Sequence, residues 1–329
     1  MRNIIIFIVV CLFTLACNER PEGLDKRLKT YKYPHKTKLF KFLSQTQKLE
    51  MAYMYIKPAK EKDNGKTFLL IHGKNFSGAY YEETINLLKE QGYTIIVPDL
   101  IGFGRSSKPV NYQYSFHNFA HSLKKLLDWY KIEKTSVLGH SMGGMVATRF
   151  ALLYPQYTEK LFLLNPIGLE DYRLFAPYKS VDEIYSAQLS TTPEKVKNYQ
   201  LKSYYDNKWD SKYDHWLQLQ TGWIKGPDWR QLAYISALTS EMIYTQPVVY
   251  EFDKLQIPTV LILGDRDRTA LGKADVSAEV LKTIGQYQLL GPKIDAMIPN
   301  SKLYMLENIG HLPHIENFQM FKQVFEKEI

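Results

Sequence analysis

A serine within a glycine-rich turn is the feature of this 329-residue sequence that most clearly suggests chemistry. Ser141 lies in the run G-H-S-M-G at residues 139–143. The apolar segment before it, 135–138, predicts a strand, and the segment after it, 143–154, predicts a helix. Glycines two positions before and after the serine permit a tight turn that larger side chains would obstruct. In this context the run lifts the serine hydroxyl above the sheet as a nucleophile. The alternative is a turn serine with no chemistry.

Two later motifs carry the other groups that a serine nucleophile needs, a base and a carboxylate. Asp265 and Asp267 directly follow an apolar segment at 259–263, and both are candidates for the carboxylate that holds the tautomer of the base. Either could instead cap a helix or pair with a neighbouring arginine. His311 directly follows a glycine after the last expected strand, which favours it as the base. His314 is expected to be structural or to face a pocket.

Apolar and amphipathic segments alternate along the chain, and this alternation predicts the elements that position these residues. Short apolar runs favour buried parallel strands, whereas the helical spacing of apolar residues is clear between 116 and 130. The sequence therefore predicts an α/β fold with a mostly parallel sheet and helices on both faces. The expected strands lie at 39–42, 51–56, 67–71, 93–97, 135–138, 160–164, 259–263 and 302–306, the first two joined as a hairpin.

Residues 168–250 interrupt this alternation. They lack short apolar strands and contain four of the five tryptophans and ten of the 24 tyrosines. We expect a helical cap here, inserted between the sixth and seventh strands of a core formed by 38–167 and 251–329. Basic and acidic residues balance within the cap, nine of each between 171 and 250, so a strongly charged substrate is not indicated. Its aromatic residues favour a small apolar acyl or aryl ester.

The chain resembles the α/β-hydrolase superfamily over almost all of residues 38–329. Besides the three motifs above, a His-Gly pair at 72–73 follows the third expected strand, and P-D-L-I-G-F-G-R-S at 98–106 follows the fourth. Both are familiar in that family. The chain order serine, acid, histidine is also that of α/β-hydrolases, and it differs from the orders in chymotrypsin-like and subtilisin-like enzymes.

The resemblance implies a role for each site residue. In the usual G-x-x-D pattern of the family the fourth position is the acid, which here favours Asp267. Ser141 and His311 then complete the catalytic triad. The oxyanion hole of the family implies backbone N–H donors from Met142 and from Lys74, the residue after the His-Gly pair.

The residues around the nucleophile narrow the reaction that the resemblance implies. A serine disfavours epoxide hydrolases and haloalkane dehalogenases, which use aspartate at this position. Carbon–carbon bond hydrolases of the meta-cleavage type usually have asparagine and tryptophan where this chain has His140 and Leu312. Proline iminopeptidases usually have tryptophan in place of Met142. We therefore expect hydrolysis of a carboxylic ester, thioester or lactone through an acyl-enzyme, with no metal and no organic cofactor. A meta-cleavage hydrolase and a non-catalytic ligand-binding protein remain the alternatives.

The first 17 residues predict an export signal. Arg2 precedes an apolar run at 4–16 that is too short to span a bilayer comfortably. The run T-L-A-C that ends at Cys17 resembles the cleavage site of bacterial lipoproteins, in which the cysteine becomes the lipidated first residue. The resemblance implies a membrane-anchored lipoprotein that faces the periplasm, with ordinary secretion or an uncleaved anchor as the alternatives.

Charge is concentrated after this signal. The whole chain has a formal net charge of +8, and residues 18–41 contain eight basic and only three acidic side chains. Residues 18–37 are therefore expected to form a basic tether, either on anionic lipid headgroups or free in solvent. Export and the absence of a binding motif disfavour nucleic acid as a partner. A hydrophobic content of 45% with 23% charged residues is typical of globular proteins, and two cysteines cannot form a disulfide scaffold.

Overall fold

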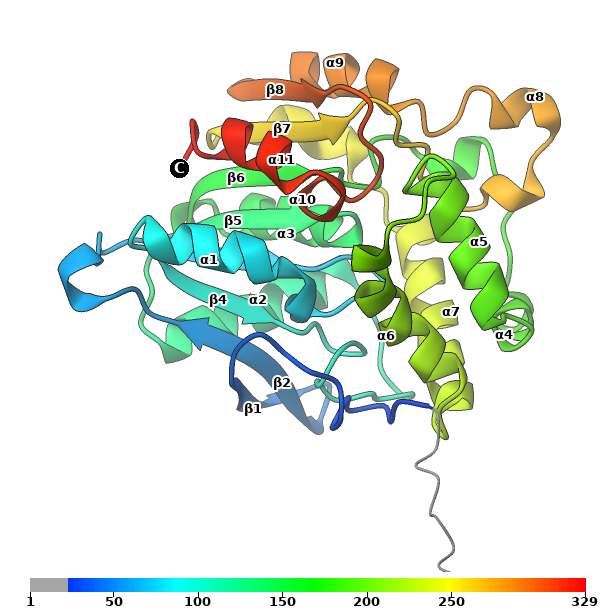
Figure 1. Ribbon diagram of the computed structural model, residues 1–329, viewed down its shortest axis with the longest axis horizontal. Coiled ribbons are helices and arrows are strands. Elements are labelled where there is room, and N and C mark those ends of the chain that lie inside the picture. Colours follow the sequence, from blue (N-terminus) through cyan, green and yellow to red (C-terminus); the bar gives the residue numbers. More distant parts are fainter. Residues whose placement is uncertain (1–22) are drawn as a thin grey trace, which may run out of the picture.

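An eight-stranded sheet forms the centre of the protein in the computed structural model, which describes residues 23–329 (Figure 1). The spatial order of its strands is β1-β2-β4-β3-β5-β6-β7-β8. β2 pairs antiparallel with β1 and with β4, and the other neighbours are parallel, which confirms the predicted fold class. The strands are β1 (Thr37–Ser44), β2 (Gln47–Ile56), β3 (Thr67–Ile71), β4 (Thr94–Pro98), β5 (Thr135–His140), β6 (Thr158–Leu164), β7 (Thr259–Gly264) and β8 (Ser301–Leu306).

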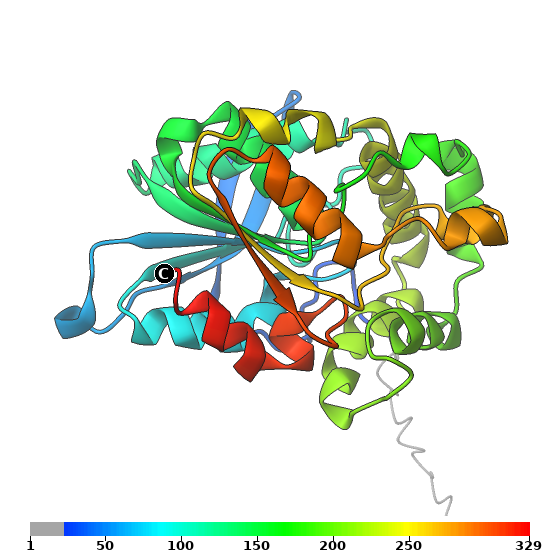
Figure 2. The same cartoon turned by 90° about the horizontal axis from the view of Figure 1, so that it is seen from above.

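Helices cover both faces of this sheet (Figure 2). All five residues of β3 are buried, and successive side chains point to opposite faces. Phe68 packs in the apolar layer beneath α1 and α11, whereas Leu69 packs in the layer beneath α2, α3 and α9. A strand buried on both sides explains the continuous apolar runs in the sequence. The helices are α1 (Glu82–Glu90), α2 (Phe116–Trp129), α3 (Met142–Leu153), α9 (Tyr287–Met297), α10 (Pro313–Glu316) and α11 (Phe318–Phe325).

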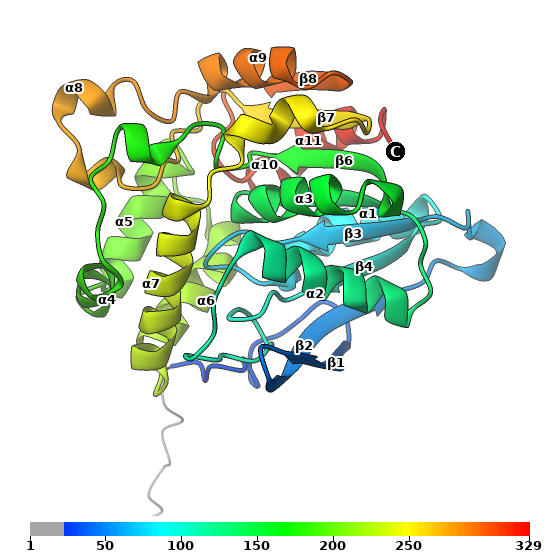
Figure 3. The ribbon, with the colours of Figure 1, turned by 180° about the vertical axis from the view of Figure 1, so that it is seen from behind.

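Four helices between β6 and β7 gather beyond the carboxyl ends of the parallel strands (Figure 3). Local sequence explains where two of them begin. The Ser180 hydroxyl accepts a hydrogen bond from the Glu183 backbone N–H, and the Ser180 backbone N–H donates to the Glu183 carboxylate in return, which forms a capping box. Thr192 caps the next helix ahead of a proline. The four helices are α4 (Val181–Leu189), α5 (Pro193–Ser203), α6 (Asp214–Ile224) and α7 (Trp229–Thr245), and α8 (Ala278–Leu281) lies between β7 and α9.

Residues 23–36 do not form the tether that their charge predicts. Leu28 and Tyr31 are buried, and the backbone N–H of Leu24 donates to the Gly222 carbonyl oxygen of α6 at 2.7 Å. The Tyr33 hydroxyl donates to the buried Asp99 carboxylate at 2.7 Å. The basic residues that suggested a tether alternate with apolar anchors, so this segment joins the core to the cap. Arg27 contributes by pairing with Glu50 of β2.

The predicted export signal and Cys17 lie outside the described residues. Within 23–329, no helix combines the length and the hydropathy needed to cross a membrane.

Candidate active site

A strained turn holds Ser141 between β5 and α3. Its backbone has φ 56° and ψ −124°, a conformation that costs free energy for any residue other than glycine. Glycine is required on both sides of the serine, because neighbouring backbone carbonyl groups lie too close to leave room for a Cβ atom. A Cβ at Gly139 would lie 2.2 Å from the Gly143 carbonyl oxygen, and one at Gly143 would lie 2.2 Å from the Ile71 carbonyl oxygen. The G-x-S-x-G run therefore packs the turn against β3 and presents the serine at the start of α3.

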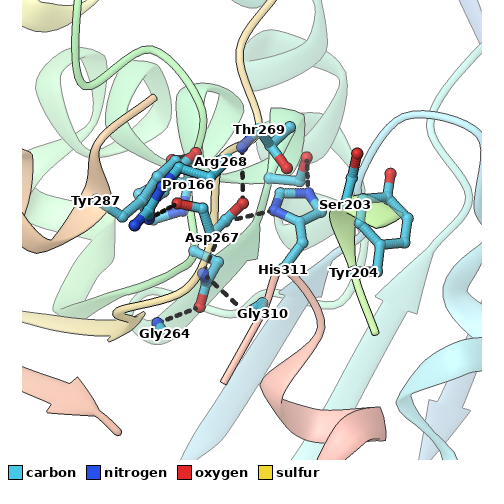
Figure 4. Close-up of polar contacts among 12 residues, drawn as sticks. Pro166, Ser203, Tyr204, Gly264, Asp267, Arg268, Thr269, Tyr287, Gly310 and His311 are labelled. Atoms are coloured by element: carbon cyan, nitrogen blue, oxygen red, sulfur yellow. Dashed lines mark hydrogen bonds and ion pairs between the residues drawn. The ribbon is translucent and has the colours of Figure 1, made fainter. Parts of the chain in front are cut away.

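The structure brings Ser141, His311 and Asp267 into one hydrogen-bonded chain. His311 Nε2 lies 2.9 Å from Ser141 Oγ. On the other side of the ring, His311 Nδ1 lies 2.7 Å from Asp267 Oδ2 (Figure 4). Asp267 is fully buried, and His311 is 1% exposed. Because the carboxylate can only accept, Nδ1 carries the proton, and Nε2 is left to accept from the serine hydroxyl. Asp265 lies apart from His311 and instead accepts from the Asn308 backbone N–H at 2.7 Å.

Further donors keep the Asp267 carboxylate ionised. Burial by itself would raise its pKa, but His311, Asn165 and Thr269 outweigh burial, and the pKa lies below its usual value. The Asn165 side-chain amide donates to Asp267 Oδ2 at 2.8 Å, and the Thr269 backbone N–H donates to Oδ1 at 2.8 Å. Asn165 Oδ1 also accepts from the Gly264 N–H at 3.1 Å, which ties the end of β6 to β7.

Sequence reasoning missed Asn165. It is a polar residue directly after the buried strand β6, fully buried itself, at the same sheet edge as the other site residues. A polar side chain at the carboxyl end of a central parallel strand was the signal that could have identified it.

His140, expected to pack within the turn, also makes two hydrogen bonds. His140 Nε2 donates to the His311 carbonyl oxygen at 2.8 Å, and Nδ1 accepts from the Tyr80 hydroxyl at 2.9 Å. The Tyr80 oxygen in turn accepts from the Gly73 backbone N–H at 2.8 Å. Burial and the neighbouring histidines hold the pKa of His140 well below its usual value, so it remains neutral. These contacts connect the loop after β3 to the loop that carries His311.

His314 does not take part in this chain. It is 2% exposed and lies against the rings of Tyr80, Tyr81 and Phe321. Neither ring nitrogen has a hydrogen-bond partner among the described residues, and burial lowers its pKa to about 3. It is a packed neutral side chain, as the sequence led us to expect.

The two predicted oxyanion donors flank the serine. Met142 directly follows Ser141 as the first residue of α3. Lys74 follows Gly73, whose Cβ position would lie only 2.9 Å from the Ser141 Cβ. In the described part of the chain, neither backbone N–H donates a hydrogen bond to a protein acceptor. Both donors are therefore free to bind a developing negative charge.

A cavity of about 470 Å³ lies between the cap and the core. Tyr204, at the end of α5, lines it and stacks on the His311 imidazole with ring centroids 5.0 Å apart (Figure 4). The cavity therefore borders the triad on the cap side through Tyr204, and Ser141, His311 and Asp267 are not among its lining residues. Its apolar walls come from Phe103 of the core and from Trp223, Trp229, Leu232 and Ile235 of the cap. Among residues 23–329 no cluster of histidine, cysteine, aspartate and glutamate is arranged to hold a metal ion.

This combination of sheet, strained serine turn and cap defines a hydrolase fold, and the chain belongs to the alpha/beta hydrolase family. The family model with the description "alpha/beta hydrolase fold" matches residues 66–318. A crystal structure described as a probable hydrolytic enzyme from Pseudomonas aeruginosa PAO1 is 43% identical, with a TM-score of 0.91 over 93% of this chain and 97% of that one.

Two curated relatives are named lipases. Lipase 1 of Psychrobacter immobilis is 26% identical over 80% of this chain and 79% of its own length. Lipase 3 of Moraxella sp. (strain TA144) is 28% identical over 78% of this chain and 75% of its own length.

Proposed function

We propose that the protein is a serine hydrolase that cleaves a carboxylic ester. The observation that carries this proposal is the hydrogen-bonded chain from Ser141 through His311 to Asp267, next to a cavity with apolar walls whose lining residue Tyr204 stacks on His311. The two relatives named lipases support the same reaction class. A thioester or a lactone would undergo the same acyl transfer.

In the proposed mechanism, Ser141 Oγ attacks the acyl carbonyl while His311 Nε2 accepts its proton. Asp267 holds His311 in the required tautomer and stabilises its positive charge. The backbone N–H groups of Met142 and Lys74 stabilise the oxyanion. His311 then protonates the leaving alcohol, and a water that it activates releases the acid from the acyl-enzyme. The apolar part of the substrate lies in the cap cavity.

Hydrolysis of p-nitrophenyl esters, from acetyl to long acyl chains, tests this proposal. The soluble domain from residue 18 onward should turn over at least one ester and react with a serine-directed fluorophosphonate. Ser141→Ala should lose both properties, with a loss of about 10⁴-fold or more in kcat. Ser122→Ala is the matched control, because its hydroxyl donates to the Asn118 carbonyl within α2 and contacts Tyr112 rather than any residue of the site. A folded Ser141→Ala that kept more than a few per cent of the turnover would contradict the mechanism.

The same assays also test the alternative reaction, carbon–carbon bond hydrolysis of the meta-cleavage type. His140 and Leu312 argue against a meta-cleavage carbon–carbon hydrolase, and the structural likeness to such enzymes is at 19% identity, which shows the fold alone. Probe labelling of Ser141 without ester turnover would bring that reaction class back. Loss of both labelling and turnover in the wild-type chain would instead support a binding protein without catalysis.

We also propose that the chain is exported and anchored to a membrane through a lipid on Cys17. The packed part of the chain starts only six residues later, at Gly23, against the backbone of Gly226 after α6. Six extended residues span at most about 20 Å, so the anchor would hold the cap side close to the bilayer. Metabolic labelling with radioactive palmitate tests this proposal. Wild-type protein should incorporate the label and sediment with membranes, and Cys17→Ala should do neither.

A further inference from the structure

The side chain of Lys74 extends from the loop beside the nucleophile to the cap. Its Nζ donates a hydrogen bond to Ser236 Oγ of α7 at 2.7 Å. Burial alone lowers the pKa of this ammonium to about 8, and no neighbouring carboxylate among the described residues counteracts that effect. An ammonium without an acidic partner is an unfavourable group to bury, because lysine head groups are normally kept in water.

Lys74 is half-buried, and Lys108, which is buried, shows how a lysine ammonium is satisfied in this fold. Lys108 Nζ donates to three carbonyl oxygens of its own loop, those of Phe103, Gly104 and Ser106, at 2.7 to 2.9 Å. An ammonium has three donors, so all of those of Lys108 are used. Lys74 uses one donor, to a neutral hydroxyl, and two remain. A neutral side chain could join core and cap through Ser236 without the cost of burying a charge, so the contact by itself does not explain a lysine here.

Lys74 lies beside the substrate cavity, between a cavity-lining residue and the nucleophile loop. Ser236, its hydrogen-bond partner, lines the 470 Å³ cavity, and so does Asn75, the next residue along the chain. Gly73, the residue before it, is in contact with Ser141. The ammonium therefore lies at the wall between the nucleophile and the cap helix α7.

The surroundings of the cavity are positive. Among the described residues, no acidic side chain lines the cavity, and its one charged lining residue is Lys195. A neighbouring cavity of about 510 Å³ shares Tyr199 with it and also has no acidic lining residue. The charged residues that line the second cavity are Lys202, Arg266, Arg268 and Lys273, of which Arg266 is paired with Glu316. The potential in this region favours an anion over a neutral or cationic group.

We propose that Lys74 binds a negatively charged oxygen group of the substrate, a carboxylate in the simplest case, while the apolar part of the same ester lies against the cap. This inference rests on the proposed esterase function and refines it. The balanced charge of the cap disfavours a strongly charged substrate, and its aromatic residues favour an apolar ester. The charge that would favour an anionic substrate is that of Lys74, which belongs to the core loop after β3 and not to the cap.

Matched pairs of esters test the proposal at pH 7. Mono-(4-nitrophenyl) glutarate and 4-nitrophenyl pentanoate differ by a carboxylate at the end of the acyl chain. 4-Acetoxybenzoate and 4-methylphenyl acetate differ by a carboxylate on the leaving group. We expect wild-type kcat/KM to be at least about tenfold higher for the anionic member of one pair. The readout is this ratio, because intrinsic reactivity cancels when the ratio is compared between variants.

Charge-removing and charge-keeping variants then assign the effect. Lys74→Met keeps the length of the side chain without its charge, and the ratio should fall at least about tenfold. Lys74→Arg and Ser236→Ala both keep a cation at the site and should retain most of the ratio. Lys195→Met removes the one cation that lines the cavity itself, and we expect its ratio to match the wild type. In wild-type protein the ratio should decline as pH rises through about 8, where the Lys74 ammonium loses its proton. That decline should be absent in Lys74→Met.

The experiment distinguishes failure of the proposed role of Lys74 from failure of the proposed esterase function. Ser141-dependent turnover of the neutral esters without a preference for the anionic member of either pair would overturn the role of Lys74 and leave the esterase intact. A preference that survives in folded Lys74→Met would overturn it as well. If Lys74→Met does not fold, Lys74→Gln replaces it in the same comparison. Absence of Ser141-dependent turnover of every ester would reject both proposals.

Discussion

His140, the residue before the nucleophile, donates a hydrogen bond from Nε2 to the backbone carbonyl oxygen of His311, the candidate base, at 2.8 Å. Its other nitrogen accepts from the Tyr80 hydroxyl, which accepts from the Gly73 N–H beside the predicted oxyanion hole. One neutral imidazole thus fixes the spacing between the loops that carry the nucleophile, the candidate base and the predicted oxyanion hole. The distance of 2.9 Å between Ser141 and His311 depends on this spacing.

Tyr80→Phe should weaken both activity and stability. The substitution removes one hydroxyl and leaves two buried groups unsatisfied, His140 Nδ1 and the Gly73 N–H. We expect the free energy of unfolding to fall by about 2–3 kcal/mol and kcat/KM to fall by about tenfold or more as the loops lose their spacing. Urea unfolding and ester kinetics measure the two effects. Tyr114→Phe is the control, because its buried hydroxyl only donates to the Pro109 carbonyl. Equal activity losses in the two variants would show that the network does not position the site.

Asn165→Ala should raise the pKa of Asp267, since it removes one of the donors that stabilise the carboxylate. A carboxyl whose pKa is depressed in the fold stabilises the protein above its unfolded pKa, about 4, and this stabilisation disappears as pH falls through the folded pKa. In the variant the loss should begin at higher pH, and kcat/KM at pH 7 should fall by about tenfold. Unfolding measured between pH 2 and 7 and the acid limb of the pH–rate profile are the readouts. The exposed Asn300→Ala should change neither.

His314→Phe should make the protein less sensitive to acid. The pKa of His314 is lowered to about 3 in the fold, so the unfolded chain binds a proton below about pH 6.5 that the folded chain does not. Stability is therefore complete above that pH and declines as pH falls toward 3, by about 1.4 kcal/mol per pH unit for this residue. A phenyl ring fills the aromatic site without titrating and should remove that slope. Denaturant unfolding from pH 7 to pH 4.5 tests it, with the exposed His121→Phe for comparison. An unchanged slope would show that His314 is not the group responsible.

Tyr33→Phe should loosen the N-terminal segment. The Tyr33 hydroxyl donates to Asp99 Oδ2 at 2.7 Å inside the protein, and the same carboxylate also accepts from the backbone of Gly78 and Arg105. Loss of one charge-assisted hydrogen bond should lower the free energy of unfolding by about 1.5–3 kcal/mol. Calorimetry measures the change, and proteolysis with mass spectrometry should show earlier cleavage within 23–36. A variant as stable as wild type would mean that the segment is held by apolar contacts alone.

Much of the site could be predicted because its main residues follow strands. Ser141, Asp267 and His311 each come directly after an apolar run or a strand, and the carboxyl ends of parallel strands meet at one edge of the sheet. Proximity of these residues therefore follows from the topology of the sheet alone. The basic run after residue 17, by contrast, was misleading as a sign of an unpacked tether. Charge is counted along the chain, whereas the anchors Leu28, Tyr31 and Tyr33 act through partners far away in sequence.

Local patterns in the amino-acid chain were sufficient for the fold class, the helical insertion and the candidates Ser141 and His311, because apolar periodicity and glycine spacing act over a few residues. The preference for Asp267 over Asp265 came from the family resemblance. Only the folded structure showed that Asn165 and Thr269 hold Asp267, that His140 and Tyr80 connect the loops, and that Tyr204 covers His311. It also placed Lys74 against Ser236, 162 residues away. These contacts are hydrogen bonds and ring contacts of a few ångströms between distant segments. Their existence depends on how strands and cap helices pack in three dimensions, which no spacing along the chain encodes.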